Sequence, residues 1–363
     1  MENSTEASCS NETIRDGFCY GLAVCGYCYD FGESIKPTKE YQQYNLIVIG
    51  IILPLIGTCG LVGNSISAFI YSRRTMLSSM NVYLCALAIS DMTIIITAFF
   101  LFFLENMRAR SVLASKFFAM LAPVTFPLGL TAQSLSVFLT VTAAVDCFIL
   151  VASSQSCKQR FCSISISLQA LIGIVFMAAL YNSPHMFEII VIDCWSVPYS
   201  QQSLDVCPTD LRQSQIYFTV YYAWMYTLVM AVGPVVLLIV LNSAIVVYMR
   251  RSPPQVDNDS DVITLVLVVC LFVSCNILPL TVNFLELFFG IVNSYLIDLS
   301  NLMVVVNSSC NFLIYYAFGS RFRRTLKEYI NVIMHGSSLN VNTKVTNGAP
   351  HIDALTTQAE FLI

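Results

Sequence analysis

Seven long apolar runs, separated by shorter polar segments, form the main pattern along the chain. A membrane-spanning helix needs about 20 mainly apolar residues, because the hydrocarbon layer of a bilayer is roughly 30 Å thick. Strands of a membrane β-barrel would alternate apolar and polar residues, and runs such as Ile47–Ile56 and Val262–Val273 do not alternate. The pattern therefore predicts an all-α membrane protein with a seven-transmembrane helix bundle. The predicted spans are approximately 45–71, 79–104, 114–150, 163–183, 215–249, 262–289 and 292–318.

The composition supports a membrane protein and excludes several other classes. The 363 residues are 56% hydrophobic and only 11% charged, whereas soluble domains are about a quarter charged. A net charge of −4 argues against a nucleic-acid-binding surface, which is typically basic. An enzyme is not expected, because the chain has no His-Glu-x-x-His pattern and no convincing Ser/His pair. A transporter is disfavoured because inverted repeats with glycine-broken helices are not evident.

The distribution of Lys and Arg predicts the orientation, since cytoplasmic loops carry more of both. With seven spans, the side of the N-terminus has 7 basic and 14 acidic residues, and the other side has 11 basic residues. The N-terminus is therefore expected outside the cell membrane. Four regions follow, namely a Cys-rich extracellular N-terminus (1–44), the seven-transmembrane domain (45–318), an amphipathic helix (319–333) and a disordered cytoplasmic tail (334–363).

The segment after the last span has a helical repeat of apolar residues. Phe318, Phe322, Leu326 and Ile330 recur every four residues, with basic residues between them. Such a pattern is typical of a helix that lies on an anionic membrane surface. Membrane lipid is thus an expected partner of this segment.

Cysteines and glycosylation sequons are concentrated on the predicted outer side. Asn3 and Asn11 each begin an Asn-x-Ser/Thr sequon. Six cysteines in an oxidising compartment are disulfide candidates, and six cysteines allow 15 pairings that the sequence does not distinguish. These candidates are Cys9, Cys19, Cys25, Cys28, Cys194 and Cys207.

Several polar residues fall at membrane depth, where they are costly and usually functional. Asp91 is a carboxylate in the middle of the second span, and amides and hydroxyls occur in three other spans. A carboxylate among such groups suits a hard cation, and hydrogen bonding between helices is the alternative. The candidate polar pocket comprises Asn64, Asp91, Ser136, Asn307, Ser308 and Asn311.

Motifs in three spans resemble those of rhodopsin-like (class A) G-protein-coupled receptors. The seventh span reads Asn307-Ser-Ser-Cys-Asn311-Phe-Leu-Ile-Tyr315, the first has Gly60-Leu-Val-Gly63-Asn64 and the second has Leu87-Ala88-Ile-Ser-Asp91. The resemblance implies a sodium ion at Asp91 and no other cofactor. It also implies a heterotrimeric G protein as an inner partner, facing Asp146, Cys147, Arg250, Arg251 and Tyr315.

Within that family, the stretches 180–188 and 209–212 resemble invertebrate FMRFamide-type neuropeptide receptors. The resemblance implies a small, cationic peptide ligand, which the acidic outer face would concentrate. Tyr217, Tyr221 and Tyr222 either line the ligand cavity or form the aromatic belt at the membrane interface, and the belt is favoured for at least half of them. The ligand-binding candidates are Glu188, Asp193, Asp205, Asp210, Tyr217, Tyr221 and Glu286.

Three departures from the family pattern affect these expectations. Cys147 stands where the family has an Arg, Phe312 stands where it has a Pro, and Ala122 stands where it has a disulfide Cys. Cys194 and Cys207 therefore pair with each other, pair with N-terminal cysteines or stay free, and the first two alternatives are favoured. The first two departures support an alternative function, a receptor-fold protein with weak or no G-protein coupling, such as a scavenger or a heteromer partner.

Overall fold

A computed structural model of the chain describes residues 18–26, 28, 38–108, 111–251 and 256–335. The chain divides into two units, Met1–Arg323 and Arg324–Ile363. The predicted sequons at Asn3 and Asn11, the disulfide candidate Cys9 and most of the predicted tail lie outside the described residues.

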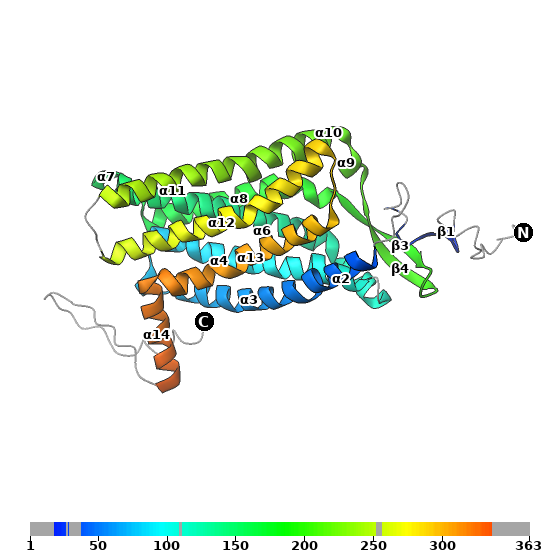
Figure 1. Ribbon diagram of the computed structural model, residues 1–363, viewed down its shortest axis with the longest axis horizontal. Helices are drawn as coiled ribbons and strands as arrows, with labels where there is room; N and C mark the ends of the chain where they lie inside the picture. The colour runs from blue at the N-terminus through cyan, green and yellow to red at the C-terminus, as the bar shows by residue number, and fades with distance from the viewer. Residues whose placement is uncertain (1–17, 27, 29–37, 109–110, 252–255, 336–363) are drawn as a thin grey trace, which may run out of the picture. The chain divides into compact units, whose positions relative to one another are not determined.

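Seven helices of the described residues are long and apolar enough to cross a membrane, which confirms the predicted bundle. They lie side by side along most of their length (Figure 1). The seven spans comprise α2 (Lys39–Ile47), η2 (Val48–Ile52) and α3 (Leu53–Tyr71); α4 (Ser79–Ala98), η4 (Phe99–Leu104) and α5 (Glu105–Arg108); α6 (Val112–Ala152); α8 (Ile164–Asn182) and η5 (Ser183–Phe187); α10 (Gln215–Tyr217), η6 (Phe218–Val232) and α11 (Gly233–Arg251); α12 (Val256–Phe289); and α13 (Ser294–Phe318).

Short polar side chains define where several of these helices begin. The hydroxyls of Thr38, Ser78, Ser111 and Ser163 each accept a hydrogen bond from the backbone N–H three residues later. Such caps satisfy N–H groups that have no partner inside the helix. Because Thr38 provides the first cap, the first helix begins at Lys39 and not at 45, where the apolar run begins.

Close contacts between helices require small residues at particular positions. A side chain at Gly60 of α3 would meet the Ser309 side chain of α13 at 2.2 Å, and one at Gly63 would meet Phe312 at 2.8 Å. Phe312 occupies the expected proline position, and α13 continues without a break from Ser294 to Phe318. The glycines of the first-span motif therefore allow α3 and α13 to pack closely.

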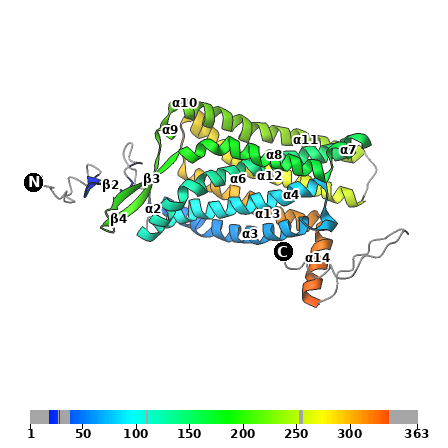
Figure 2. The ribbon, with the colours of Figure 1, turned by 180° about the vertical axis from the view of Figure 1, so that it is seen from behind.

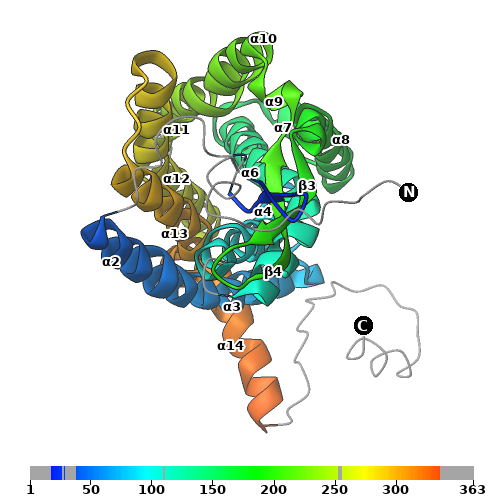
Figure 3. The ribbon, with the colours of Figure 1, turned by 90° about the vertical axis from the view of Figure 1, so that its right-hand side faces the viewer.

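A four-stranded sheet in the order β1-β2-β3-β4 lies at one end of the bundle (Figures 1 and 3). β3 (Ile189–Ser196) and β4 (Gln201–Pro208) form an antiparallel hairpin after α8. β1 (Phe18–Cys19) and β2 (Leu22–Val24) come from the N-terminal segment, and β2 pairs with β3 in parallel. The sequence-based prediction did not include this sheet.

The remaining elements connect or follow the spans. η3 (Arg74–Met76) follows α3, α7 (Gln155–Phe161) follows α6, and α9 (Asp210–Gln213) follows β4. Seen from behind, α8 lies beside α6 and α4 (Figure 2), which it contacts. The helix α14 (Ser320–His335) begins one residue later and ends two residues later than the predicted segment 319–333.

Candidate ligand-binding site

Two adjoining cavities lie inside the bundle. The first, which we name the tyrosine cavity, has a volume of about 100 Å³ and is lined by α6, α8, η5, η6, α11, α12 and α13. The second, which we name the roof cavity, has a volume of about 360 Å³ and is lined partly by Ile189 of β3 and Val206 of β4. Leu130 and Gln133 of α6 line both cavities, which are therefore neighbours.

Aromatic side chains with hydrogen-bonding groups line the tyrosine cavity. Tyr221 is buried, and its hydroxyl donates to the carbonyl of Tyr181 at 2.6 Å. The Tyr181 hydroxyl is itself buried and has no hydrogen-bond partner. Tyr222 also lines the cavity. Tyr221 and Tyr222 are therefore cavity residues, and the aromatic-belt interpretation that the sequence favoured is wrong for these two. A ligand that offers a hydrogen bond to Tyr181 would remove the cost of leaving that hydroxyl unpaired.

Glu188 lies at the centre of a hydrogen-bonded cluster beside the tyrosine cavity. Its carboxylate is fully buried. The Tyr217 and Tyr222 hydroxyls each donate to it at 2.6 Å, and His185 Nδ1 lies 2.6 Å from Oε1. The Arg212 guanidinium is 3.6 Å away. Glu188, which directly follows η5, thus links η5, α9, α10 and η6. It was predicted to be a ligand contact, whereas its carboxylate is buried and engaged by these side chains.

The same contacts determine how readily Glu188 ionises. Burial raises the pKa of this carboxyl, but the hydrogen bonds from His185, Tyr217 and Tyr222 favour the charged form, and the pKa is lowered from 4.5. A carboxyl whose pKa is lowered by folding stabilises the folded state above its unfolded pKa. That contribution disappears as the pH falls through the lowered folded pKa.

We therefore expect the Glu188→Gln receptor to be less stable than wild type at pH 6, by about 2 kcal/mol, because hydrogen bonds to a charged group are lost. The difference should shrink as the pH falls from 6 to 3, since the wild-type carboxylate then becomes neutral. Thermal unfolding of the two detergent-solubilised proteins over this range measures the effect. A difference that stays constant with pH would show that the charge of Glu188 does not stabilise the fold.

The roof cavity combines apolar walls with two opposite charges. Phe118 and Phe126 of α6 line it together with Glu105 of α5 and Arg212. Arg212 lies over the Phe126 ring, with its guanidinium carbon 5.4 Å from the ring centroid. The buried Glu188 pairs with Arg212, and Glu105 lies 3.6 Å from Arg108. Because Arg108 also pairs with Asp205, the three groups Glu105, Arg108 and Asp205 together carry one net negative charge.

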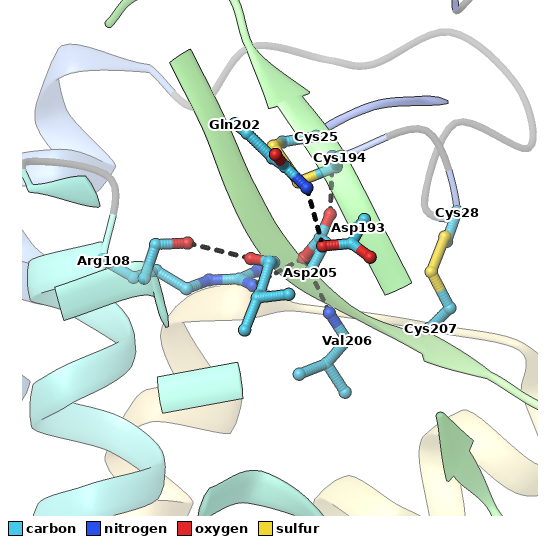
Figure 4. Close-up of a disulfide and its surroundings, with 12 residues drawn as sticks. Cys25, Cys28, Arg108, Asp193, Cys194, Gln202, Asp205, Val206 and Cys207 are labelled. Carbon is cyan, nitrogen blue, oxygen red and sulfur yellow. Dashed lines mark hydrogen bonds and ion pairs between the residues drawn. A yellow bond between two sulfur atoms is a disulfide. The ribbon is translucent and has the colours of Figure 1, made fainter. Parts of the chain in front are cut away.

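The other predicted acidic ligand contacts differ in their accessibility. Asp205 is buried, accepts from the Gly26 backbone N–H at 2.6 Å and forms an ion pair with Arg108 at 3.1 Å (Figure 4). It is engaged within the protein, unlike the free group that was predicted. Asp193, Asp210 and Glu286 are exposed, and Asp193 accepts from Gln202.

Disulfides join the N-terminal segment to the sheet. Cys25 is bonded to Cys194 and Cys28 to Cys207 (Figure 4), and Cys19 is also disulfide-bonded. The structure thus has the pairing with N-terminal cysteines, and the alternative pairing of Cys194 with Cys207 is wrong for this structure. The reason is that β2 lies alongside β3 and brings Cys25 next to Cys194.

The predicted intramembrane pocket is assembled around Asp91, which is fully buried. Asn311 donates to its carboxylate at 2.8 Å, and Ser136 Oγ lies at 3.5 Å. Asn64 donates to the Ser308 carbonyl at 2.7 Å. The side-chain oxygens of Asn64, Ser308 and Asn311 are buried without hydrogen-bond partners. Asn307 is buried as well and lines the tyrosine cavity.

The residues predicted to face a G protein are divided by burial. Arg250 and Arg251 are exposed, whereas Asp146 is buried and accepts from Ser79 at 2.7 Å. Cys147 has no exposed surface, and neither does Tyr315. Tyr315 packs edge-on against Tyr71, with ring centroids 5.2 Å apart. Contrary to the prediction, Cys147 and Tyr315 do not face outward in this arrangement.

Sequence reasoning missed four residues that the structure places near the site. His185 and Arg212 surround Glu188, and Arg108 pairs with Asp205. Asp298 of α13 is buried and accepts from Asn45 at 2.8 Å. Asp298 could have been found from the sequence, because an Asp inside a predicted span is unusual. The roles of the other three residues depend on partners that only the folded structure shows.

A seven-helix bundle with two internal cavities beneath a disulfide-linked sheet defines an integral multi-pass membrane receptor. The family described as "7 transmembrane receptor (rhodopsin family)" matches residues 63–315. The chain therefore belongs to the rhodopsin family of seven-transmembrane receptors, and the resemblance noted in its motifs is confirmed.

Three relatives have names that indicate a receptor. "Probable G-protein coupled receptor frpr-1" of Caenorhabditis elegans is 58% identical over 98% of this chain and 98% of its own length. "FMRFamide receptor" of Drosophila melanogaster is 30% identical over 80% of this chain and 55% of its own length. "FMRFamide peptide receptor frpr-18" of Caenorhabditis elegans is 28% identical over 79% of this chain and 69% of its own length.

Proposed function

We propose that this protein is a cell-membrane receptor for an extracellular neuropeptide of the FMRFamide type and that it activates a heterotrimeric G protein. The N-terminus and the sheet lie outside the cell in this proposal. The observation that carries it is the pair of adjoining cavities, which offers aromatic walls, the unpaired Tyr181 hydroxyl and the Glu105 carboxylate. These groups suit a short amidated peptide that contains aromatic residues and a cation.

Activation would be a shift between two packings of the bundle. The tyrosine cavity contacts α12 through Phe272 and Asn276, and α13 through Asn307 and Ser308. A peptide that binds a second packing more tightly increases the population of that packing. Because Cys147 and Tyr315 are buried in the present arrangement, the second packing is the one that would expose the inner surface to a G protein.

A panel of amidated peptides, applied to cells that express the receptor at a measured surface level, tests this function. We expect a saturable G-protein response to at least one peptide that ends in Arg-Phe-amide, and a weaker response to the same peptide as a free acid. Gln133→Ala should lower potency about tenfold, because Gln133 lines both cavities and a hydrogen-bonding side chain is lost. Gln169→Ala, on an exposed position of α8, is the matched control and should leave potency unchanged.

Binding without activation would instead favour the second candidate, a receptor-fold protein that captures peptide or pairs with another receptor. The observation behind it is Cys147, a buried thiol where the family has an Arg. Cys147→Arg in the same assay separates the two functions. A gain of coupling in that variant would indicate that the native chain couples weakly, and no binding of any peptide would contradict both.

We further propose that the Asp91 pocket binds a sodium ion. A fully buried carboxylate is costly without a positive partner, and Asp91 has no ion pair among the described residues. The unpaired oxygens of Asn64, Ser308 and Asn311 fit a hard cation, which prefers oxygen ligands. Ser136 and Ser308 also line the tyrosine cavity, so an ion here would adjoin the peptide site.

A further inference from the structure

The N-terminal segment, residues 22–26 and 28, is attached to the outer hairpin by several independent bonds. β2 extends the sheet along β3, and the Cys25 N–H donates to the Trp195 carbonyl at 3.1 Å. Two disulfides follow within four residues, from Cys25 to β3 and from Cys28 to β4. Between these two cysteines in the sequence, the Gly26 N–H donates to Asp205. Figure 4 shows Asp205 beside the two disulfides. Segments that are 169 and 179 residues apart in sequence are thus covalently joined.

The two faces of β4 contact different parts of the protein. Leu204 and Val206 pack against Phe118, Ala119 and Ala122 of α6. Asp205 and Cys207 lie on the opposite face, because side chains alternate along a strand. The N-terminal segment contacts both of them, and Arg108 of α5 also pairs with Asp205.

The bundle itself holds β4 only by non-covalent contacts among the described residues. These contacts include the packing of Leu204 and Val206, the ion pair from Arg108 to Asp205, and a hydrogen bond from Ser115 to the Leu204 carbonyl at 3.2 Å. Position 122 is an alanine that touches this cluster, so α6 forms no disulfide with β4 there. The bonds from residues 25 and 28 are the covalent restraints that act on the hairpin.

The position of this hairpin determines the shape of the roof cavity. Ile189 of β3 and Val206 of β4 form part of its wall, and Arg212 follows β4 by a few residues. A shift of β4 would therefore move an apolar wall and a charged side chain of the cavity at the same time.

We propose that residues 22–26 and 28 are a covalent part of the ligand site, and that Cys25, Cys28 and Asp205 are positioning residues for the peptide. Through their bonds to β3 and β4 they restrain the hairpin and so keep the roof cavity in the shape that binds the ligand. The proposal rests on the proposed function for its peptide readout. In this proposal the N-terminal segment restrains β4 covalently, whereas the described residues of the bundle contact β4 only by non-covalent interactions.

Two disulfide-deleted receptors, Cys25→Ala/Cys194→Ala and Cys28→Ala/Cys207→Ala, test the proposal in the full chain. Each should raise the peptide concentration for half-maximal response at least tenfold and leave the maximal response per surface receptor near wild type. A merely structural role would lower the amount at the surface without changing the half-maximal concentration. The matched control is Cys59→Ala/Cys270→Ala, which removes two exposed free cysteines and should change neither quantity.

Asp205→Ala is the second variant and keeps both disulfides. It therefore tests the proposal even if a cysteine variant fails to reach the cell surface. It should raise the half-maximal concentration severalfold, because the contacts to Gly26 and Arg108 are lost. Glu40→Ala, on an exposed position of α2, is its control. A wild-type half-maximal concentration for Asp205→Ala, or for either cysteine pair at the surface, would overturn the proposal.

A measurement without peptide separates this proposal from the proposed function. Val206 is buried, so Val206→Cys should react slowly with a membrane-impermeant maleimide. The rate should rise at least tenfold when Val206→Cys is combined with Cys28→Ala/Cys207→Ala. If no peptide activates the wild type but this rise occurs, the ligand assignment fails while the restraint of β4 stands. An unchanged rate would overturn the restraint whatever the ligand.

Discussion

Replacing Gly60 by alanine is expected to destabilise the receptor strongly, although only one methyl group is added. The new Cβ would lie 2.6 Å from Ser309 Cβ and 2.2 Å from Ser309 Oγ. The hydroxyl can rotate away, but the Ser309 Cβ is fixed by the backbone of α13, so α3 and α13 must separate. Overpacking of this kind costs about 1–3 kcal/mol. We expect a lower unfolding temperature in detergent and less receptor at the cell surface.

Gly173 provides the matched control for this substitution. It lies in α8, and a Cβ added there would meet nothing within 4 Å. Gly173→Ala should therefore be neutral or stabilise the receptor by up to about 1 kcal/mol, because alanine favours the helix. The same chemical change is thus expected to have opposite signs at the two positions.

A second-site change identifies the clash as the cause. Ser309→Gly removes the two nearest of the three atoms that the Gly60 Cβ would meet and leaves Ile95 Cδ1 at 2.9 Å, so it should restore part of the stability that Gly60→Ala loses. Ser309→Ala leaves the Cβ in place and should restore much less. Equal losses for Gly60→Ala with and without Ser309→Gly would show that the helix contact is not what limits position 60.

The number and type of spans could be predicted from sequence because each depends on a local property. A helix in a bilayer must be apolar along its whole length, so every span leaves a continuous signal in the chain. The intramembrane pocket could also be predicted in part, since Asp91 and Asn311 stand out against apolar neighbours. The motifs could not predict which side-chain oxygens lack a hydrogen-bond partner, because that depends on the side-chain geometry across four helices.

The end of the bundle that carries the sheet could not be predicted in the same way. Glu188 and Asp205 looked like free acidic groups because an exposed and a buried carboxylate are identical in sequence. Their partners lie far away along the chain, as in the bond from Gly26 to Asp205 over 179 residues. The pairing of β2 with β3 likewise joins a short N-terminal strand to the hairpin, and a strand of three residues carries almost no signal of its own.

The substitution with the largest expected effect on ligand response is Asp91→Asn. If the Asp91 pocket holds sodium as proposed, the ion and the peptide act on one network, because Ser136 and Ser308 touch both sites. Coupling between two such sites typically changes affinity by about 5–150-fold. Asparagine keeps the shape of the side chain but removes the charge that attracts the ion.

Peptide affinity is to be measured in sodium chloride and in N-methylglucamine chloride at equal ionic strength. Wild-type affinity should change about tenfold between the two salts, and Asp91→Asn should bind equally in both. Equal ionic strength matters because any attraction between a cationic peptide and acidic residues of the proposed outer face is screened by either salt. If the affinity of Asp91→Asn still differs between the two salts, sodium acts elsewhere, for example at the proposed outer face. The buried oxygens of Asn64, Ser308 and Asn311 would then need a partner other than sodium.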